Sequence, residues 1–300
     1  CSPEQILVCS TGVIGVPLPV DKIVAALPEL AHNAVSSASS YEEFTHAILT
    51  TDTKPKWAAA HFKIGGKQVK VIGCAKGAGM IHPRMATMLA YVVTDAAASP
   101  VVLQKLLADV SRRTFNAITV DGDSSTNDTA LLIASGASGA PALREGTRDY
   151  AAFEKAFEKV CKSLALAIVS DGEGASRVID IHIKGAPSVE GAEQVANTIA
   201  TSPLVKTALS GGDPNWGRIL AAAGRAGVAF NPDRATIRMA GIRVYERGRA
   251  PYFDEGAAHE KLLAPTVSIV MDLRAGKAHA RIWTCDFTAE YVHINASYRT

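Results

Sequence analysis

The segment from Lys76 to Leu89 constrains this chain more than any other, because it joins a glycine-rich loop directly to an apolar strand. Gly77 and Gly79 allow the backbone to adopt positive φ and to pass close to another group. Residues 88–93 are continuously apolar, which is typical of a buried strand. Thr87 therefore stands where a flexible loop meets the beginning of a rigid element.

Composition narrows the class of protein and its partners. Three hundred residues with 48% hydrophobic and 20% charged content predict a soluble globular protein of one large or two medium domains. The 31 basic and 29 acidic residues are spread along the chain, and no stretch reaches the roughly 18 apolar residues of a membrane helix. We therefore expect neither nucleic acid nor a membrane as partner. The cysteines and histidines show no metal-ligand spacing, so no metal is expected.

Hydrophobic periodicity predicts a mixed α/β chain, divided into residues 1–180 and 181–300. Asp21 and Ser40 are the expected N-caps of two early helices, and Ser99 with Pro100 should begin a third. Gly65-Gly66 predicts a hairpin turn between two strands. Further helices are expected over 153–164 and 191–200, and strands over 60–64, 67–72, 88–93, 117–120, 129–134, 179–183, near 236, 267–273 and 278–283.

Thr87 has the setting of a self-activated nucleophile. A threonine hydroxyl needs an adjacent base, and its own α-amine, with an ordinary pKa of about 7.7–8.0, can serve once the Ala86–Thr87 bond is cut. Cleavage would follow attack of the hydroxyl on the Ala86 carbonyl, an acyl shift and hydrolysis of the ester. Threonine is also common in strands because β-branched residues favour them, so this hypothesis needs corroborating segments.

Other segments could complete such a site. The Ser10-Thr11-Gly12 turn offers a hydroxyl and a glycine N–H for a developing oxyanion. Glu173, between two glycines after the long helix, could hold a substrate ammonium group. Residues 121–128 form a polar loop between strands, and residues 211–218 join a flexible stretch to the start of a helix; either could also support a site. Taken alone, Ser10-Thr11-Gly12 is more typical of an ordinary turn, and the segment around Glu173 fits an exposed turn equally well. Residues 73–79 match neither the P-loop nor the dinucleotide-binding spacing.

Together, the Ser10-Thr11-Gly12 turn, the Met85-Ala86-Thr87-Met88-Leu89 run and residues 295–300 resemble the ornithine acetyltransferase family, the glutamate N-acetyltransferases of arginine biosynthesis. The resemblance covers the whole chain. It implies cleavage before Thr87 into residues 1–86 and 87–300. An acetyl group then passes in ping-pong order from N-acetylornithine to Thr87 and on to glutamate. No cofactor is implied, although acetyl-CoA could act as a second acetyl donor.

The resemblance also assigns roles to single residues. A cationic Lys76 suits a substrate carboxylate, and Glu173 suits the ammonium group of ornithine. Serine and asparagine are common in the family where Ala78 and Arg84 stand, so hydrogen bonding ahead of the cleavage junction is expected to differ here. The implied set is Thr11 and Gly12 for the oxyanion, Ala86 and Thr87 for the cleavage junction, and Thr50 (with Thr51 as an alternative), Lys76, Thr87, Glu173, Asn295 and Thr300 for substrate binding.

The family fold is mixed α/β, with sheets layered between helices in outline like N-terminal-nucleophile hydrolases, and with a smaller carboxy-terminal α/β domain. The resemblance implies oligomers of cleaved pairs that act on small molecules in the cytoplasm, or in the mitochondrial matrix of a eukaryote. Family members carry a further segment upstream, which this chain is expected to lack. Two rival hypotheses remain: an amidase or aminopeptidase that releases the acyl group to water, and an uncleaved chain that binds an amino acid without turnover.

Overall fold

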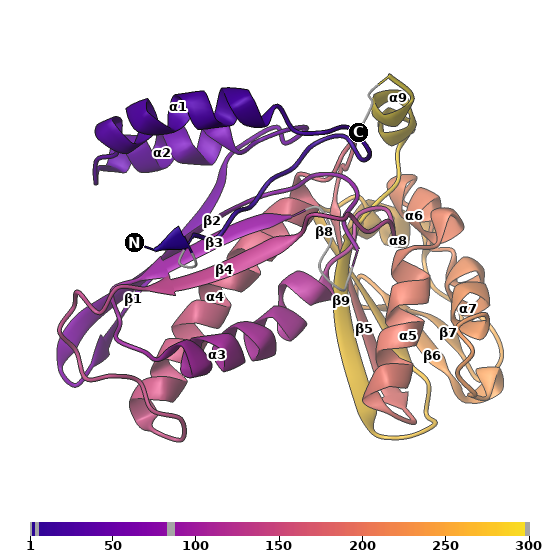
Figure 1. The fold of residues 1–300 in the computed structure, drawn as a ribbon. Helices are drawn as coiled ribbons and strands as arrows, with labels where there is room; N and C mark the ends of the chain where they lie inside the picture. The colour runs from indigo at the N-terminus through magenta and orange to yellow at the C-terminus, as the bar shows by residue number, and fades with distance from the viewer. Residues whose placement is uncertain (1, 4–5, 83–87, 298–300) are drawn as a thin grey trace.

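Two β-sheets, each with its own helices, make up the computed structural model, which describes residues 2–3, 6–82 and 88–297 (Figure 1). The first sheet has the strand order β1-β2-β3-β4 and the second the order β7-β6-β8-β5-β9. Each sheet contributes to a separate cluster of buried apolar side chains. The mixed α/β class with layered sheets and helices is therefore confirmed.

The elements follow the chain in two groups. Those of the first half are α1 (Val20–Asn33), α2 (Ala38–Ala47), β1 (Lys56–Ile64), β2 (Lys67–Lys76), β3 (Leu89–Thr94), α3 (Pro100–Arg113), the 3-10 turn η2 (Phe115–Ala117), β4 (Thr129–Ala134) and α4 (Arg148–Ser170). Those of the second half are β5 (Val178–Ala186), α5 (Val189–Ala200), α6 (Pro203–Ser210), α7 (Trp216–Gly224), η3 (Pro232–Arg234), β6 (Thr236–Met239), β7 (Ile242–Glu246), α8 (Glu255–Leu262), β8 (Thr266–Asp272), β9 (Ala278–Cys285) and α9 (Ala289–Ser297).

The first sheet brings separate loops to one edge. The predicted hairpin is confirmed, because β1 and β2 pair from Ile64 with Lys67 around the two glycines. Strand β3 is antiparallel to β2 but parallel to β4, with Leu89 opposite Thr129. Parallel strands begin at the same edge of a sheet. Met88, directly before β3, and Asp128, directly before β4, therefore lie next to each other, and the Met88 N–H donates to Asp128 Oδ1.

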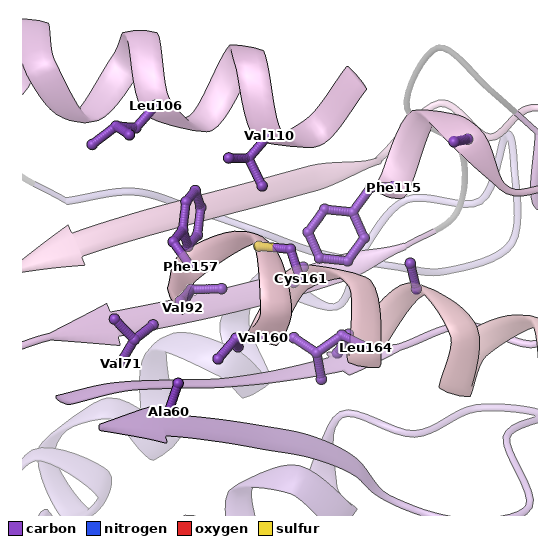
Figure 2. Packing of buried hydrophobic residues seen from close by; sticks show 14 of the residues in the cluster. Ala60, Val71, Val92, Leu106, Val110, Phe115, Phe157, Val160, Cys161 and Leu164 are labelled. Carbon is purple, nitrogen blue, oxygen red and sulfur yellow. The ribbon is translucent and has the colours of Figure 1, made fainter. Parts of the chain in front are cut away.

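Helix α4 builds the core of this half, beneath the sheet and beside α3 (Figure 1). Its apolar residues recur at helical spacing, which places them on one stripe. Phe157 lies toward Leu106 and Val110 of α3, as Figure 2 shows. Val160 and Leu164 pack on the sheet where Gly73 leaves space for them. All five of these side chains are at most 1% exposed, so each contributes about 1.5–3 kcal/mol of apolar burial.

The two halves join through strand β9 and a buried lysine. The end of β9 carries Trp283 and Cys285 into the core of the first half. Lys206 of α6, 3% exposed, donates from Nζ to Val120 O at 2.7 Å and to Thr284 Oγ1 at 2.9 Å. The division at residue 180 falls within β5 and stays a prediction.

Some expected details are confirmed and others are wrong. Ser99 caps α3 by accepting the Val102 N–H, as predicted. Helix α1 begins at Val20 after Pro19, whose fixed φ can precede a helix, so Asp21 lies in the first turn and is not the cap. Ser37 rather than Ser40 caps α2, because the Ser37 hydroxyl accepts the Ser40 N–H at 3.0 Å.

The predicted strand over residues 117–120 is absent from the structure. A 3-10 turn ends at Ala117, and Ile118 makes only an isolated bridge with Trp283. Residues 117–120 are all buried, because they pass beside β9 where the two halves meet. Burial, not sheet pairing, therefore explains this apolar run. Separately, no helix in the described part of the chain has both the length and the apolar character to cross a bilayer.

Candidate active site

Lys76, the last residue of β2, provides a buried positive charge at the edge of the first sheet. Its side chain is 1% exposed, and Nζ donates to Thr50 Oγ1 at 2.9 Å. Burial lowers the pKa of Lys76, and this desolvation outweighs the opposing effect of the Asp52, Asp128 and Glu173 charges. An anionic ligand bound to Lys76 would stabilise its charged form against this cost of burial.

Glu173 provides a buried negative charge close to the same loop. It follows α4, is 7% exposed, and accepts a hydrogen bond from Asn295 Nδ2 of α9 at 2.8 Å. Its backbone N–H donates to Ala78 O at 2.9 Å. Any Cβ at Gly79 would lie 2.5 Å from the Glu173 carboxylate, so glycine is required for this approach. Ala78 accepts this hydrogen bond through its backbone carbonyl, so a serine at this position could accept the same bond.

A buried ion triad holds three loops of the site together. Lys56 Nζ lies 2.5 Å from Asp52 Oδ1 and 2.6 Å from Asp171 Oδ2, and all three side chains are 0–3% exposed. Asp52 also accepts the Gly77 N–H at 2.7 Å and the Thr50 N–H at 3.3 Å. Burial alone would raise the pKa of Asp52, but these donors and the Lys56 charge lower it.

Asp121 holds the loop that follows Lys76. It accepts the Met80 N–H at 2.7 Å, the Ile81 N–H at 3.1 Å and the hydroxyl of Tyr291 at 3.2 Å. Burial raises the pKa of Asp121 despite these donors. Met80 has a φ of 53°, a left-handed conformation that costs a non-glycine residue about 1–2 kcal/mol. The hydrogen bonds to Asp121 therefore compensate for backbone strain in the loop.

Asp128 lies where β3 and β4 begin. Its Oδ1 accepts the Met88 N–H at 2.7 Å, whereas its buried Oδ2 has no hydrogen-bond partner among the described residues. Burial raises the pKa of Asp128 to about 6, and the Met88 N–H and the Lys76 charge act in the opposite direction. Burial therefore affects the pKa of Asp128 more than the hydrogen bond and the lysine charge do.

The structure brings together part of the predicted set. Thr50, not Thr51, contacts Lys76, and Asn295 contacts Glu173. Thr11 is half-buried and Gly12 exposed in the segment before α1, and no hydrogen bond within the described ranges links them to those four residues. Ala86, Thr87 and Thr300, together with Arg84, lie outside the described residues.

Several residues of this site are not in the predicted set. No motif marks Asp52, Lys56, Asp171 or Tyr291. Lys56 binds Asp171, 115 positions away in the sequence, and Tyr291 binds Asp121, 170 positions away. Asp52 and Asp171 each lie two residues from a predicted site residue, Thr50 and Glu173 respectively. This closeness in sequence was the only signal that pointed to Asp52 and Asp171. The helix start predicted within residues 211–218 is confirmed, because α7 begins at Trp216 and Asn215 caps it by accepting the Arg218 N–H.

The arrangement suits a ligand that carries both charges. A buried ammonium and a buried carboxylate face one loop, each held by an uncharged partner, which is the chemistry that recognises a zwitterionic amino acid. Within 6–82 and 88–297, no group of three or more His, Cys, Asp or Glu side chains could hold a metal ion.

Comparison with known proteins identifies the family. The ArgJ family matches residues 1–300. The arginine biosynthesis bifunctional protein ArgJ of Symbiobacterium thermophilum is 45% identical over 298 residues, covering 99% of this chain and 74% of the relative. That of Listeria monocytogenes strain F2365 is 46% identical over 297 residues, with the same shares. The crystal structure of the Bacillus halodurans ArgJ protein is 40% identical with a TM-score of 0.67, covering 69% of this chain and 98% of that one. The chain therefore belongs to the ArgJ family.

Proposed function

We propose that this chain is an acetyltransferase of arginine biosynthesis that moves an acetyl group from N-acetylornithine to glutamate. The observation that carries the proposal is the pair of buried opposite charges, Lys76 and Glu173, beside one glycine-rich loop. Lys76 would bind the substrate α-carboxylate, and Glu173 the side-chain ammonium of ornithine. The name of the relatives, arginine biosynthesis bifunctional protein, supports the pathway.

The proposed chemistry begins with cleavage of the Ala86–Thr87 bond, which frees the α-amine of Thr87. That amine takes the proton of the Thr87 hydroxyl as the oxygen attacks the acetyl carbonyl of N-acetylornithine. Thr11 and Gly12 would donate hydrogen bonds to the oxyanion. The proton passes to the departing ornithine amine, an acetyl ester forms on Thr87, and the amine of glutamate then takes the acetyl group from that ester.

The word bifunctional in the relatives' name favours a second acetyl donor. We extend the proposal to acetyl-CoA, which would acetylate the same Thr87 oxygen and release the free thiol. A cytoplasmic location and assembly of cleaved pairs into oligomers remain predictions.

The proposal is tested by a denaturing gel with amino-terminal sequencing, followed by incubation with acetyl-labelled N-acetylornithine. We expect a fragment that begins Thr-Met-Leu, with label on its first residue that leaves on addition of glutamate. Thr87→Ala should abolish cleavage and labelling, whereas Thr198→Ala, a matched change on the remote helix α5, should affect neither.

Two outcomes would replace the proposal by its rivals. Loss of the label to water at the same rate with and without glutamate would identify an amidase. A single intact band that binds N-acetylornithine but takes no label would identify a binding protein without turnover. In either case Thr87 would not be the acetyl carrier of a transferase.

A further inference from the structure

A surface pocket between helices α6 and α7 has no part in the proposed chemistry. Its volume is about 530 Å³, which lies within the roughly 300–1,000 Å³ of small-ligand sites in proteins. The two helices lie side by side (Figure 1), and Arg218 Nη1 of α7 donates to Leu204 O of α6 at 2.9 Å. The lining of this α6–α7 pocket combines arginine, serine and asparagine with alanine, and includes no acidic side chain of the described chain.

Two arginines give the pocket a positive charge. Arg218 lies in the first turn of α7, and Arg225 is the C-cap seven residues later, so both side chains leave the same side of the helix. Between them on that side lie Ala221 and Ala222, whose small side chains leave room for a ligand. In the part of the chain that the structure describes, neither arginine forms an ion pair, and Arg225 makes no side-chain hydrogen bond. The charge of the pocket is therefore not neutralised by the described residues.

Ser202 provides a buried hydroxyl that faces the same pocket. It is the N-cap of α6, lines the pocket and is 6% exposed. A serine at an N-cap normally accepts an N–H from the first turn of its helix, as Ser99 does for α3, but the Ser202 side chain makes no such bond. A buried hydroxyl without a partner is costly, and native proteins rarely leave one so. The Ser202 hydroxyl therefore indicates a ligand with a hydrogen-bond acceptor.

The first turns of both helices add backbone donors. Leu204 of α6 and Gly217 of α7 line the pocket, and the N–H of neither donates to another described residue. The first N–H groups of an α-helix have no partner within the helix and carry a partial positive charge. Phosphate binds readily at such helix ends, and arginine side chains recognise phosphate oxygens through several N–H donors. All the polar groups described for this pocket thus suit one kind of ligand, an anion with several oxygens.

We propose that the α6–α7 pocket binds a phosphate group. The guanidinium groups of Arg218 and Arg225 supply the charge, the N–H groups at the two helix ends donate to phosphate oxygens, and the Ser202 hydroxyl completes the set of donors. Binding is non-covalent. The inference goes beyond acetyl transfer and does not depend on Thr87.

The pocket borders a loop of the candidate active site, which bears on the source of the phosphate. Thr201, directly before α6 and its cap, lies against Gly122, since a Cβ on Gly122 would be 3.2 Å from Thr201 Cγ2. The neighbouring Asp121 accepts the Met80 N–H of the glycine-rich loop. Two phosphate-bearing ligands fit this position: CoA, whose acyl-bearing arm would continue toward the active site, and a nucleotide that binds in the pocket alone.

Isothermal titration calorimetry of the wild-type protein with inorganic phosphate, ADP and CoA, at constant ionic strength, tests the site. We expect at least one of the three to bind, and Arg225→Gln should raise its Kd about 10-fold, the equivalent of one hydrogen bond to a charged group. Arg112→Gln is the matched control, because Arg112 is an exposed arginine in the last turn of α3, and its Kd should equal that of the wild type. Binding of none of the three ligands, or equal Kd values for Arg225→Gln and wild type, would overturn the inference.

Ser202→Ala separates ligand binding from a structural role. Because the Ser202 side chain makes no capping bond, alanine should leave the unfolding temperature unchanged and weaken binding several-fold. A lower unfolding temperature with an unchanged Kd would show that the hydroxyl serves the helix, and would overturn the inference. In NMR spectra of the wild type, the amide signals of Leu204 and Gly217 should shift as ligand is added; shifts confined to residues outside the pocket would also overturn it.

The choice of ligands identifies the source of the phosphate. A Kd for CoA about 10-fold or more below that for ADP would assign the pocket to the second acetyl donor, and that use rests on the proposed function. Equal values for CoA and ADP would assign it to a nucleotide, and equal values for all three to free phosphate. Thr87→Ala should bind the ligand with wild-type Kd although it transfers no acetyl group, so either proposal can fail while the other stands.

Discussion

Replacement of Lys56 by methionine should destabilise the protein more than any other single lysine replacement in the first half. Lys56 Nζ lies 2.5 Å from Asp52 and 2.6 Å from Asp171, and its side chain is 0% exposed. Methionine fills a similar volume, so the change removes a charge and leaves two buried carboxylates facing each other. Breaking a buried ion pair from one side costs about 3–5 kcal/mol. That loss is a large part of a total stability of about 5–15 kcal/mol.

The effect of Lys56→Met should depend on pH in a defined direction. In the wild type the pKa of Asp52 is lowered, so its stabilisation is present above the ordinary aspartate pKa of about 3.9 and is lost as the pH falls through the folded-state pKa. Without Lys56, burial should raise the pKa of Asp52 above that value. The difference in stability between variant and wild type should therefore shrink from pH 7 toward pH 4.

Urea unfolding followed by circular dichroism at pH 7 and pH 4 measures this effect. Lys54→Met is the matched control, because Lys54 is exposed and two residues away, and should change the free energy of unfolding by less than about 0.5 kcal/mol. Asp171→Asn added to Lys56→Met should recover part of the loss by removing one uncompensated charge. A loss below about 1 kcal/mol at pH 7, or an equal loss at both pH values, would refute the account of the triad.

Three further predictions concern the loop, the substrate charge and the core. Met80→Gly should stabilise the protein by up to about 1 kcal/mol in thermal unfolding, because glycine adopts the φ of 53° without strain; destabilisation would show that the Met80 side chain matters more than its backbone. Burial lowers the pKa of Lys76, so this lysine should lose its charge below the ordinary lysine pKa of about 10.4. The KM for N-acetylornithine should therefore begin to rise below that pH. A KM that stays constant up to that pH would contradict substrate binding by Lys76. Phe157→Ala should cost about 3–5 kcal/mol in urea unfolding, since Phe157 is 0% exposed, and a cost below 1 kcal/mol would mean that the core closes over the cavity.

The fold was predictable where a local pattern and the tertiary environment agree. The Gly65-Gly66 turn, the Ser99 cap and the apolar stripe of α4 each carry their own signal, and the structure contains all three. Residues 117–120 show the opposite case, because an apolar run has the same composition whether it is buried by sheet pairing or by packing between two halves. Strand β7 and helix α9 were missed, since half of their residues or more remain partly or fully exposed and give weak periodicity.

Local patterns singled out Thr87, Thr11, Gly12 and Glu173, and the family resemblance added Lys76, Thr50 and Asn295. Two pairs of those residues are in hydrogen-bond contact in the structure, Lys76 with Thr50 and Glu173 with Asn295. The residues that hold them were not predictable, because a contact such as Lys56 with Asp171 depends on where the end of α4 meets the beginning of β1. A lysine two residues after another lysine, in a polar stretch, is usually solvent-exposed. Only the three-dimensional structure shows that Lys56 is buried.

Asp171 and Glu173 connect the buried ion triad to the proposed substrate-binding groups. The two acids are separated by one glycine at the end of α4, yet Asp171 binds Lys56 and Glu173 binds Asn295. Asp52 has the same double connection, since it pairs with Lys56 and also fixes the backbone of Thr50 and Gly77. A change that weakens the triad must therefore move the groups around Lys76 and Glu173 as well. Variants at Lys56 should lose substrate affinity in proportion to stability, whereas variants at Asn295 should lose affinity alone.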